Sequence, residues 1–161
     1  MPESWGTRVY RWLFNWFPAY RGTGARVTYI ASDWSEMRVR LPLSWRTRNY
    51  VGTIFGGSMY GAIDPMFMFM LIKILGPDYI VWDKAATIRF RRPGRDTLTA
   101  TLALSPETVL DIKAATDQAG KTEKDFVVDL VSASGEVHAS FTKLVSIRRR
   151  DASPPASRPP G

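Results

Sequence analysis

The chain has 161 residues, enough for one domain with a sizeable core, and its 45% apolar and 23% charged residues are typical of globular proteins. It contains no cysteine and one histidine, His138, which excludes disulfides, thiolate nucleophiles and multi-histidine metal sites. The net charge of +7 suits nucleic acid, anionic lipid or a phosphorylated small molecule, but no nucleic-acid-binding motif is present, so nucleic acid is the weakest option. We expect no cofactor.

A cytoplasmic protein without integral membrane contact is the simplest expectation. The longest uncharged runs stay below 18 residues, and the N-terminus lacks the residue order of a signal peptide.

Residues 5–18 predict a short amphipathic helix that ends at Pro18. Val9, Trp12, Leu13 and Trp16 share one face. That face could lie on a membrane surface, but the favoured interpretation is that it covers the core of its own domain or of a partner subunit. We therefore assign residues 1–19 to an N-terminal helix packed on the domain.

Two strands are predicted next, at residues 25–34 and 36–43, joined by a hairpin turn at 32–35. Apolar and basic residues alternate in the second strand with the period of a half-buried strand: Met37, Arg38, Val39, Arg40 and Leu41. A loop without periodicity then leads to Gly57.

Residues 58–75 predict a helix that is apolar almost all round, about 27 Å long, and therefore buried. It carries one carboxylate, Asp64, directly before Pro65. The proline removes a backbone donor, so we expect a kink that frees the Gly61 carbonyl.

Four further strands are predicted at residues 80–91, 97–104, 125–132 and 136–147, with a helix at 105–120. This order predicts an α+β fold in which six antiparallel strands surround one helix. Because one sheet covers only part of that helix, we expect a second subunit to cover the rest. The domain would span residues 20–147, and residues 148–161 would form a disordered tail rich in proline and arginine.

The stretch N-Y-V-G-T-I-F-G-G-S-M-Y-G-A-I-D resembles the hotdog-fold acyl-CoA thioesterases of the PaaI type. Their motif runs Asn, a glycine, then His-Gly-Gly opening the central helix, then Asp seven residues after the second glycine. Asn49, Gly52, Gly56, Gly57 and Asp64 fall on that spacing. The family's histidine is replaced by Phe55.

Residues 78–95 are similar to a little-characterised PaaI-like branch. The resemblance covers about residues 20–147. It implies a hotdog fold, in which a sheet of about six strands wraps around a long central helix.

Asp64 is the leading candidate catalytic residue, because an unpaired carboxylate on a buried helix is costly. It could act as a general base on water or as a nucleophile. The alternative is a structural aspartate, paired with an arginine or a backbone N–H. Gly57 lies about 10 Å away along the helix, so one helix cannot easily supply both groups, and the resemblance implies a site shared by two subunits.

The helix start offers unpaired backbone N–H groups at Gly56 and Gly57 that suit an oxyanion, although a tight turn would use the same glycines. Asn49 could orient water or the thioester carbonyl, or could be a turn residue. The further candidate substrate contacts are residues of an apolar tunnel and arginines that would bind the phosphates of coenzyme A. The alternative for the arginines is a solvated basic strand end. The candidates are Phe55, Gly56, Met59, Phe67, Met68, Arg89, Arg91, Arg92 and Arg95. His138 lies in a late strand, far from the motif in sequence, and is interpreted as an ordinary strand residue remote from the site.

These features predict an acyl-CoA thioesterase that forms a homodimer or tetramer and hydrolyses a CoA thioester to free acid and CoA. One rival, favoured by Phe55, is a non-catalytic acyl-CoA or lipid-binding protein of the same fold. A hotdog dehydratase is disfavoured because the helix region has no histidine. A protein that acts at the membrane surface through residues 5–18 is the third rival.

Overall fold

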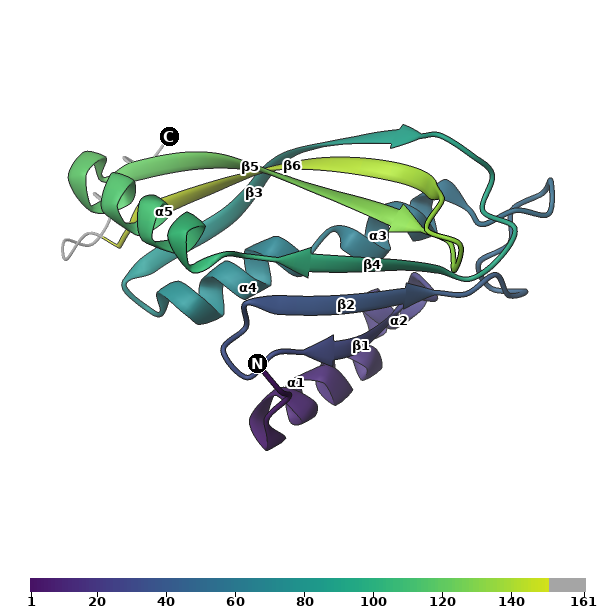
Figure 1. The fold of residues 1–161 in the computed structure, drawn as a ribbon, viewed down its shortest axis with the longest axis horizontal. Helices are drawn as coiled ribbons and strands as arrows, with labels where there is room; N and C mark the ends of the chain where they lie inside the picture. The colour runs from purple at the N-terminus through teal and green to yellow at the C-terminus, as the bar shows by residue number, and fades with distance from the viewer. Residues whose placement is uncertain (151–161) are drawn as a thin grey trace, which may run out of the picture.

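An antiparallel sheet of six strands packs around a long, broken central helix (Figure 1). The computed structural model describes residues 1–150. The strand order across the sheet is β1-β2-β4-β5-β6-β3, so β1 and β3 form its two edges. The strands are β1 (Arg26–Ile30), β2 (Glu36–Leu41), β3 (Tyr79–Phe90), β4 (Leu98–Ala103), β5 (Lys121–Val131) and β6 (Val137–Arg149).

The central helix consists of α3 (Gly56–Ile63) and α4 (Met66–Leu75), separated at Asp64 and Pro65. Both separating residues keep right-handed helical dihedrals, so the chain is kinked there and not reversed. The break at Pro65 confirms the kink predicted from the missing proline N–H. Gly56–Leu75 has the length and apolar composition of a membrane-spanning helix, and 44% of its apolar 18-residue window is buried inside this fold.

The core lies between this helix and the inward face of the sheet. Phe67 stacks on Phe126 of β5 with ring centroids 4.8 Å apart. The buried residues of the helix are Met59, Ala62, Ile63, Met66, Phe67, Met70 and Leu71. The alternating burial of β2 and β4 follows the two-residue period read from the sequence.

The N-terminal helix α1 (Trp5–Trp16) forms as predicted and packs on the domain, but not through the face expected to cover the core of its own chain. Thr7 is buried and Phe14 packs against the core, whereas Val9, Trp12, Leu13 and Trp16 are exposed, and their burial by a partner subunit stays a prediction. The reason is a tertiary contact: Asn15 uses both ends of its amide to hydrogen-bond the N–H and C=O of Val27, at 2.8 and 2.9 Å. These bonds satisfy the free edge of β1 and fix which side of the helix faces the domain.

A short helix, α2 (Pro18–Gly22), connects α1 to β1, and α5 (Pro106–Ala119) connects β4 to β5. Two predicted boundaries shift. β5 begins at Lys121 instead of residue 125, and β6 continues to Arg149, which also pairs with Asp117 at 2.8 Å. The first residues of the expected tail therefore belong to a strand. Residues 151–161 lie outside the described part of the chain.

Candidate functional site

Asp64 stands at the kink of the central helix, where its side chain meets the sheet. Its Oδ1 accepts a hydrogen bond from Lys143 Nζ of β6 at 2.7 Å. Its side chain is 41% exposed. Among residues 1–150 Lys143 is the side chain that hydrogen-bonds Asp64 by distance. The Tyr60 hydroxyl also lies near this carboxylate: burial and the neighbouring Asp64 raise the pKa of Tyr60. One carboxylate oxygen is thus held by the ammonium, while the other has only the neutral Tyr60 hydroxyl nearby and remains available to water or a substrate.

Lys143 is a buried ammonium placed between two carboxylates. Its side chain is 2% exposed, and Nζ also lies 3.2 Å from Oδ2 of Asp83 on the edge strand β3. A register shift in the β3–β6 pairing falls directly after Asp83. The cluster therefore consists of one buried ammonium, that of Lys143, between the carboxylates of Asp64 and Asp83.

The pKa values of this cluster reflect its burial. Burial lowers the pKa of Lys143, but its hydrogen bond to Asp64 and the charges of Asp83 and Asp64 outweigh this, so the pKa lies above its ordinary value. Burial raises the pKa of Asp83, and the Lys143 ammonium offsets that only in part. Asp83 Oδ1 is buried without a hydrogen-bond partner among the described residues, which accounts for the cost of ionising it.

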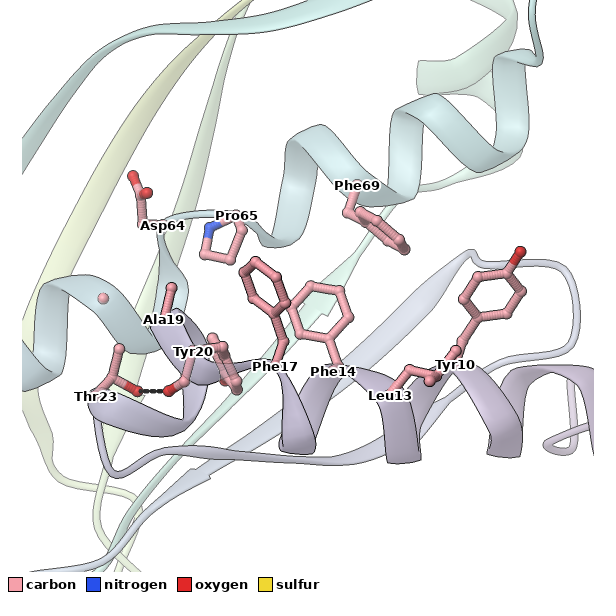
Figure 2. Close-up of a pocket in the computed structure, with 11 residues that line it drawn as sticks. Tyr10, Leu13, Phe14, Phe17, Ala19, Tyr20, Thr23, Asp64, Pro65 and Phe69 are labelled. Carbon is pink, nitrogen blue, oxygen red and sulfur yellow. Dashed lines mark hydrogen bonds between the residues drawn. The ribbon is translucent and has the colours of Figure 1, made fainter.

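An apolar cavity of about 540 Å³ lies between α1–α2 and α3–α4, with Asp64 and Pro65 on its rim (Figure 2). The rings of Phe14, on α1, and Phe17, between α1 and α2, point toward Pro65 and Phe69, while the Asp64 carboxylate points away from these rings. The lining is almost wholly apolar, and its volume is in the range of small-molecule sites.

Glycine is required at position 61, where α2 approaches α3 along this cavity. A Cβ added there would lie 2.7 Å from the Thr23 methyl group.

The N-terminal end of α3 presents the two predicted donors. Within residues 1–150 neither the Gly56 nor the Gly57 N–H meets an acceptor, and Phe55 supplies no side-chain cap. Aromatic rings cover both glycines. A Cβ on Gly57 would lie 2.3 Å from the Phe55 ring, and one on Gly56 would lie 2.8 Å from the Phe90 ring. Any oxygen that reaches these donors must pass beside the two rings.

A second cavity, of about 380 Å³, opens beside this helix end. It brings together five of the residues selected from the sequence: Asn49, Gly56, Met59, Arg91 and Arg92. The loop before α3 and the segment after β3 are joined by a hydrogen bond from the Ile54 N–H to the Gly94 carbonyl, at 2.8 Å.

Asn49 is committed to its own loop. Its side-chain oxygen accepts from the N–H groups of Val51 and Thr53, and its amide donates to Thr53 Oγ1 at 2.9 Å. This is the turn-residue alternative left open by the sequence. The loop shapes the second cavity, and Asn49 would have to give up a bond to orient a substrate.

The remaining predicted contacts are dispersed. Arg91 donates to Ser140 Oγ at 2.9 Å and Arg92 pairs with Glu136 at 2.9 Å, so both are oriented at the cavity. Arg89 and Arg95 are exposed and line neither cavity. Phe67 is part of the core, and the half-buried Met68 also lines neither cavity.

His138 lies in β6 as predicted, but it is not remote from the motif, because its Nδ1 is 3.1 Å from the carbonyl of Pro93, which lines the second cavity.

Comparison with known families gives a match to a domain of unknown function, DUF4442, over residues 6–146. The chain belongs to this family. No curated protein matches the chain in sequence.

Solved structures establish the fold. A Pseudomonas aeruginosa protein of unknown function, designated "Probable Thioesterase", superposes with a TM-score of 0.79 at 22% identity, covering 93% of this chain and 99% of that one. A thioesterase from Haemophilus influenzae gives 0.65 at 12% identity, covering 91% and 93%. The PaaI protein of the Escherichia coli phenylacetic acid degradation operon gives 0.60 at 15% identity, covering 90% and 93%. The DUF4442 chain therefore has the hotdog fold, and its resemblance to the PaaI type is confirmed at the level of structure.

Sequence reasoning did not select Asp83 or Lys143. A signal for Lys143 was present: it stands in phase with the apolar residues of β6, Ala139, Phe141, Val145 and Ile147, all of which are buried. A lysine at an inward-facing position requires a buried acid. Asp83 carried no comparable signal, because its proximity depends on how β3 pairs with β6.

Proposed function

We propose that this DUF4442 protein hydrolyses acyl thioesters, with acyl-CoA as the substrate class. The observation that carries the proposal is Asp64, a carboxylate anchored through one oxygen by a buried lysine at the rim of an apolar cavity. A structural aspartate would be expected to use both oxygens within the fold. An anchored carboxylate with one free oxygen is the arrangement required of a general base or a nucleophile.

The chemistry needs few groups. As a general base, Asp64 would take a proton from water while the water oxygen attacks the thioester carbonyl carbon, and the C–S bond would then break to release the thiol. As a nucleophile, its free oxygen would form a transient anhydride that water hydrolyses. In both routes Lys143 would position Asp64 and neutralise its resting charge, and the N–H of Gly57 would stabilise the oxyanion.

Two cavities match the two parts of such a substrate. The apolar cavity would hold the acyl group, and the second cavity, with Arg91 and Arg92, would hold the phosphates of coenzyme A. Because Gly57 and Asp64 are about 10 Å apart along one helix, we further propose that Gly57 of one copy works with Asp64 of a second copy.

A homodimer, or a tetramer built from it, is supported by two surfaces that a single chain leaves uncovered. On the central helix, Tyr60 and Ile72 are exposed and Met68 is half-buried, on the side that carries Asp64. The edge strand β3 pairs only with β6 among the described strands, which leaves its outer edge free, and Trp82 on it is largely exposed. Light scattering should give a mass of two or four chains, and a stable monomer would reject the shared site.

The proposal is tested by a hydrolysis screen of the purified protein across acyl-CoA chain lengths, with release of free CoA as the readout. We expect turnover that depends on acyl length, because the apolar cavity has a limited volume of about 540 Å³. An absence of turnover with any thioester, in a protein shown to be folded, would reject hydrolysis.

Non-catalytic binding of acyl-CoA is the second candidate, favoured by the Phe55 ring over Gly57. It predicts saturable ligand binding without turnover. Phe55→His would then be informative, because replacing the ring by the residue found in the family motif should leave binding intact and raise hydrolysis only if the remaining site is competent. A cytoplasmic location stays a prediction.

A further inference from the structure

The outer face of α1 is an exposed aromatic surface that the proposed reaction does not use. Trp5, Trp12 and Trp16 are 81%, 58% and 56% exposed, and Val9 and Leu13 lie between them on the same side of the helix. We call Trp5, Val9, Trp12, Leu13 and Trp16 the outer face. The helix docks on the domain through its opposite side, at Thr7, Phe14 and Asn15. Three exposed tryptophans on one helix are unusual, because large aromatic side chains are normally buried.

Positive charge flanks this face. Residues 1–22 contain three arginines and one acid, Glu3. Arg8 is 63% exposed and lies 3.5 Å from Glu3, and the Arg21 guanidinium lies 5.0 Å from the centre of the Trp16 ring. Glu3 is 13% exposed and is paired more closely with Arg11, at 2.8 Å, so two arginines share this one acid and the net charge beside the outer face stays positive. On the neighbouring strands, Arg26 and Arg40 stand opposite each other in register.

We propose that the outer face of α1 docks this protein on an anionic lipid surface. A helix with aromatic residues on one side, basic residues beside them and modest overall hydrophobicity lies in the bilayer interface with its apolar side inserted. Tryptophan prefers that region because its ring is apolar and its N–H is polar. The net charge of +7 adds long-range attraction to acidic headgroups.

The topology leaves this face accessible. The proposed contact between copies uses the β3 edge and the Asp64 side of the central helix, whereas α1 covers the opposite β1 edge, and no tryptophan of the outer face belongs to either proposed contact surface. The apolar cavity is next to the docking surface, because Leu13 belongs to both and the exposed Phe17 continues from one to the other. The docking proposal does not depend on hydrolysis.

The test is sedimentation of the full chain with vesicles of phosphatidylcholine and phosphatidylserine, and with vesicles of phosphatidylcholine alone. We expect binding to the anionic vesicles that weakens at high salt, and a blue shift of tryptophan fluorescence. Trp12→Ala combined with Trp16→Ala should reduce partitioning at least about ten-fold, since each inserted ring contributes about that factor. Arg8→Glu combined with Arg21→Glu should reduce binding to anionic vesicles selectively.

The matched control is Trp45→Ala combined with Tyr50→Ala, which removes two exposed aromatic rings from the loop before α3 and should leave binding unchanged. Melting curves of all variants exclude unfolding as the cause. The proposal is overturned if the wild-type chain does not sediment with anionic vesicles, or if the control pair loses as much binding as the α1 pair. It is also overturned if light scattering shows that the α1 pair lowers the number of associated chains, because a second copy would then cover the face.

Discussion

The two cavities along the central helix differ in what holds their polar groups. Around the cavity of about 380 Å³ each polar side chain is held separately: Asn49 by its own loop, Arg91 by Ser140 and Arg92 by Glu136. Beside the apolar cavity of about 540 Å³ one ammonium, that of Lys143, pairs both Asp64 and Asp83. Loss of one group should therefore have a local effect around the smaller cavity, whereas loss of Lys143 should affect both carboxylates beside the larger one.

Substitutions should therefore act differently in the two regions. Changes around the charged cluster should alter reaction rate, stability and pH dependence together, because the same ammonium serves all three. Changes at the arginines should alter the binding of phosphorylated substrates only.

Asp64→Asn should remove most of kcat, by about 10²–10⁴-fold, because the amide cannot accept a proton or form an anhydride at a useful rate. Ligand affinity should survive, since both cavities keep their shape. The control is Asp111→Asn, which neutralises an exposed aspartate of α5. Measuring kcat, affinity and melting temperature on one preparation separates a catalytic role of Asp64 from a structural one. Full activity in a folded Asp64→Asn variant would reject the catalytic assignment.

Lys143→Met should lower the free energy of unfolding by about 1–3 kcal/mol at neutral pH, because it leaves two carboxylates without their ammonium. The loss is smaller than for a fully buried pair, since Asp64 and Asp83 are 41% and 21% exposed. Activity should fall as well, with kcat more affected than KM. Denaturant unfolding and steady-state kinetics measure both effects.

The stability difference between wild type and Lys143→Met should depend on pH, because the pKa of Lys143 is raised in the folded protein. A raised pKa means that the folded state holds the proton more tightly than the unfolded chain, so the stabilisation is complete below the unfolded value of about 10.5 and disappears as the pH rises through the folded value. The stability gap between wild type and Lys143→Met should therefore be constant from pH 7 to 9 and narrow in strong alkali. A gap that widens there would contradict the assigned ion pair.

Arg91→Ala combined with Arg92→Ala should raise KM for CoA thioesters several-fold and leave kcat unchanged, because phosphate contacts act equally in the ground and transition states. Short thioesters without the nucleotide should be unaffected. Arg26→Ala, an exposed arginine of β1, is the control. Equal effects on both substrate types would instead indicate that these arginines support the fold through Ser140 and Glu136.

Asp83→Asn should have the smallest effect, within about 1 kcal/mol at pH 7, because Asp64 still pairs Lys143. Its signature is a pH trend. The pKa of Asp83 is raised, so its ionised form is penalised in the folded protein at neutral pH, and protonation relieves that penalty as the pH falls toward the unfolded value of about 3.8. Wild type should therefore gain stability relative to Asp83→Asn on acidification from pH 7 to 4. The opposite trend would show that the Lys143 ammonium lowers the pKa of Asp83 by more than burial raises it.

Much of the fold was readable from local pattern. The two-residue alternation of β2, the helical run interrupted by Pro65 and the Ser105-Pro106 start of α5 each depend on neighbouring residues only, and all appear in the structure. The glycines at the start of α3 and the carboxylate at its kink were selected by spacing in the same way. These features were predictable because propensity and periodicity act within a few residues.

Tertiary structure decided the rest. Sequence put the tryptophans of α1 inward, because apolar faces are normally buried, but two hydrogen bonds from Asn15 to the β1 edge turned that face to solvent. Sequence likewise presented Asp64 as an unpaired charge, whereas the fold brings it to Lys143, 79 positions along the chain, and the pairing of β3 with β6 places Asp83 beside the same ammonium. Such contacts depend on strand register and edge pairing, which follow from the free energy of the whole sheet and from no local stretch of residues.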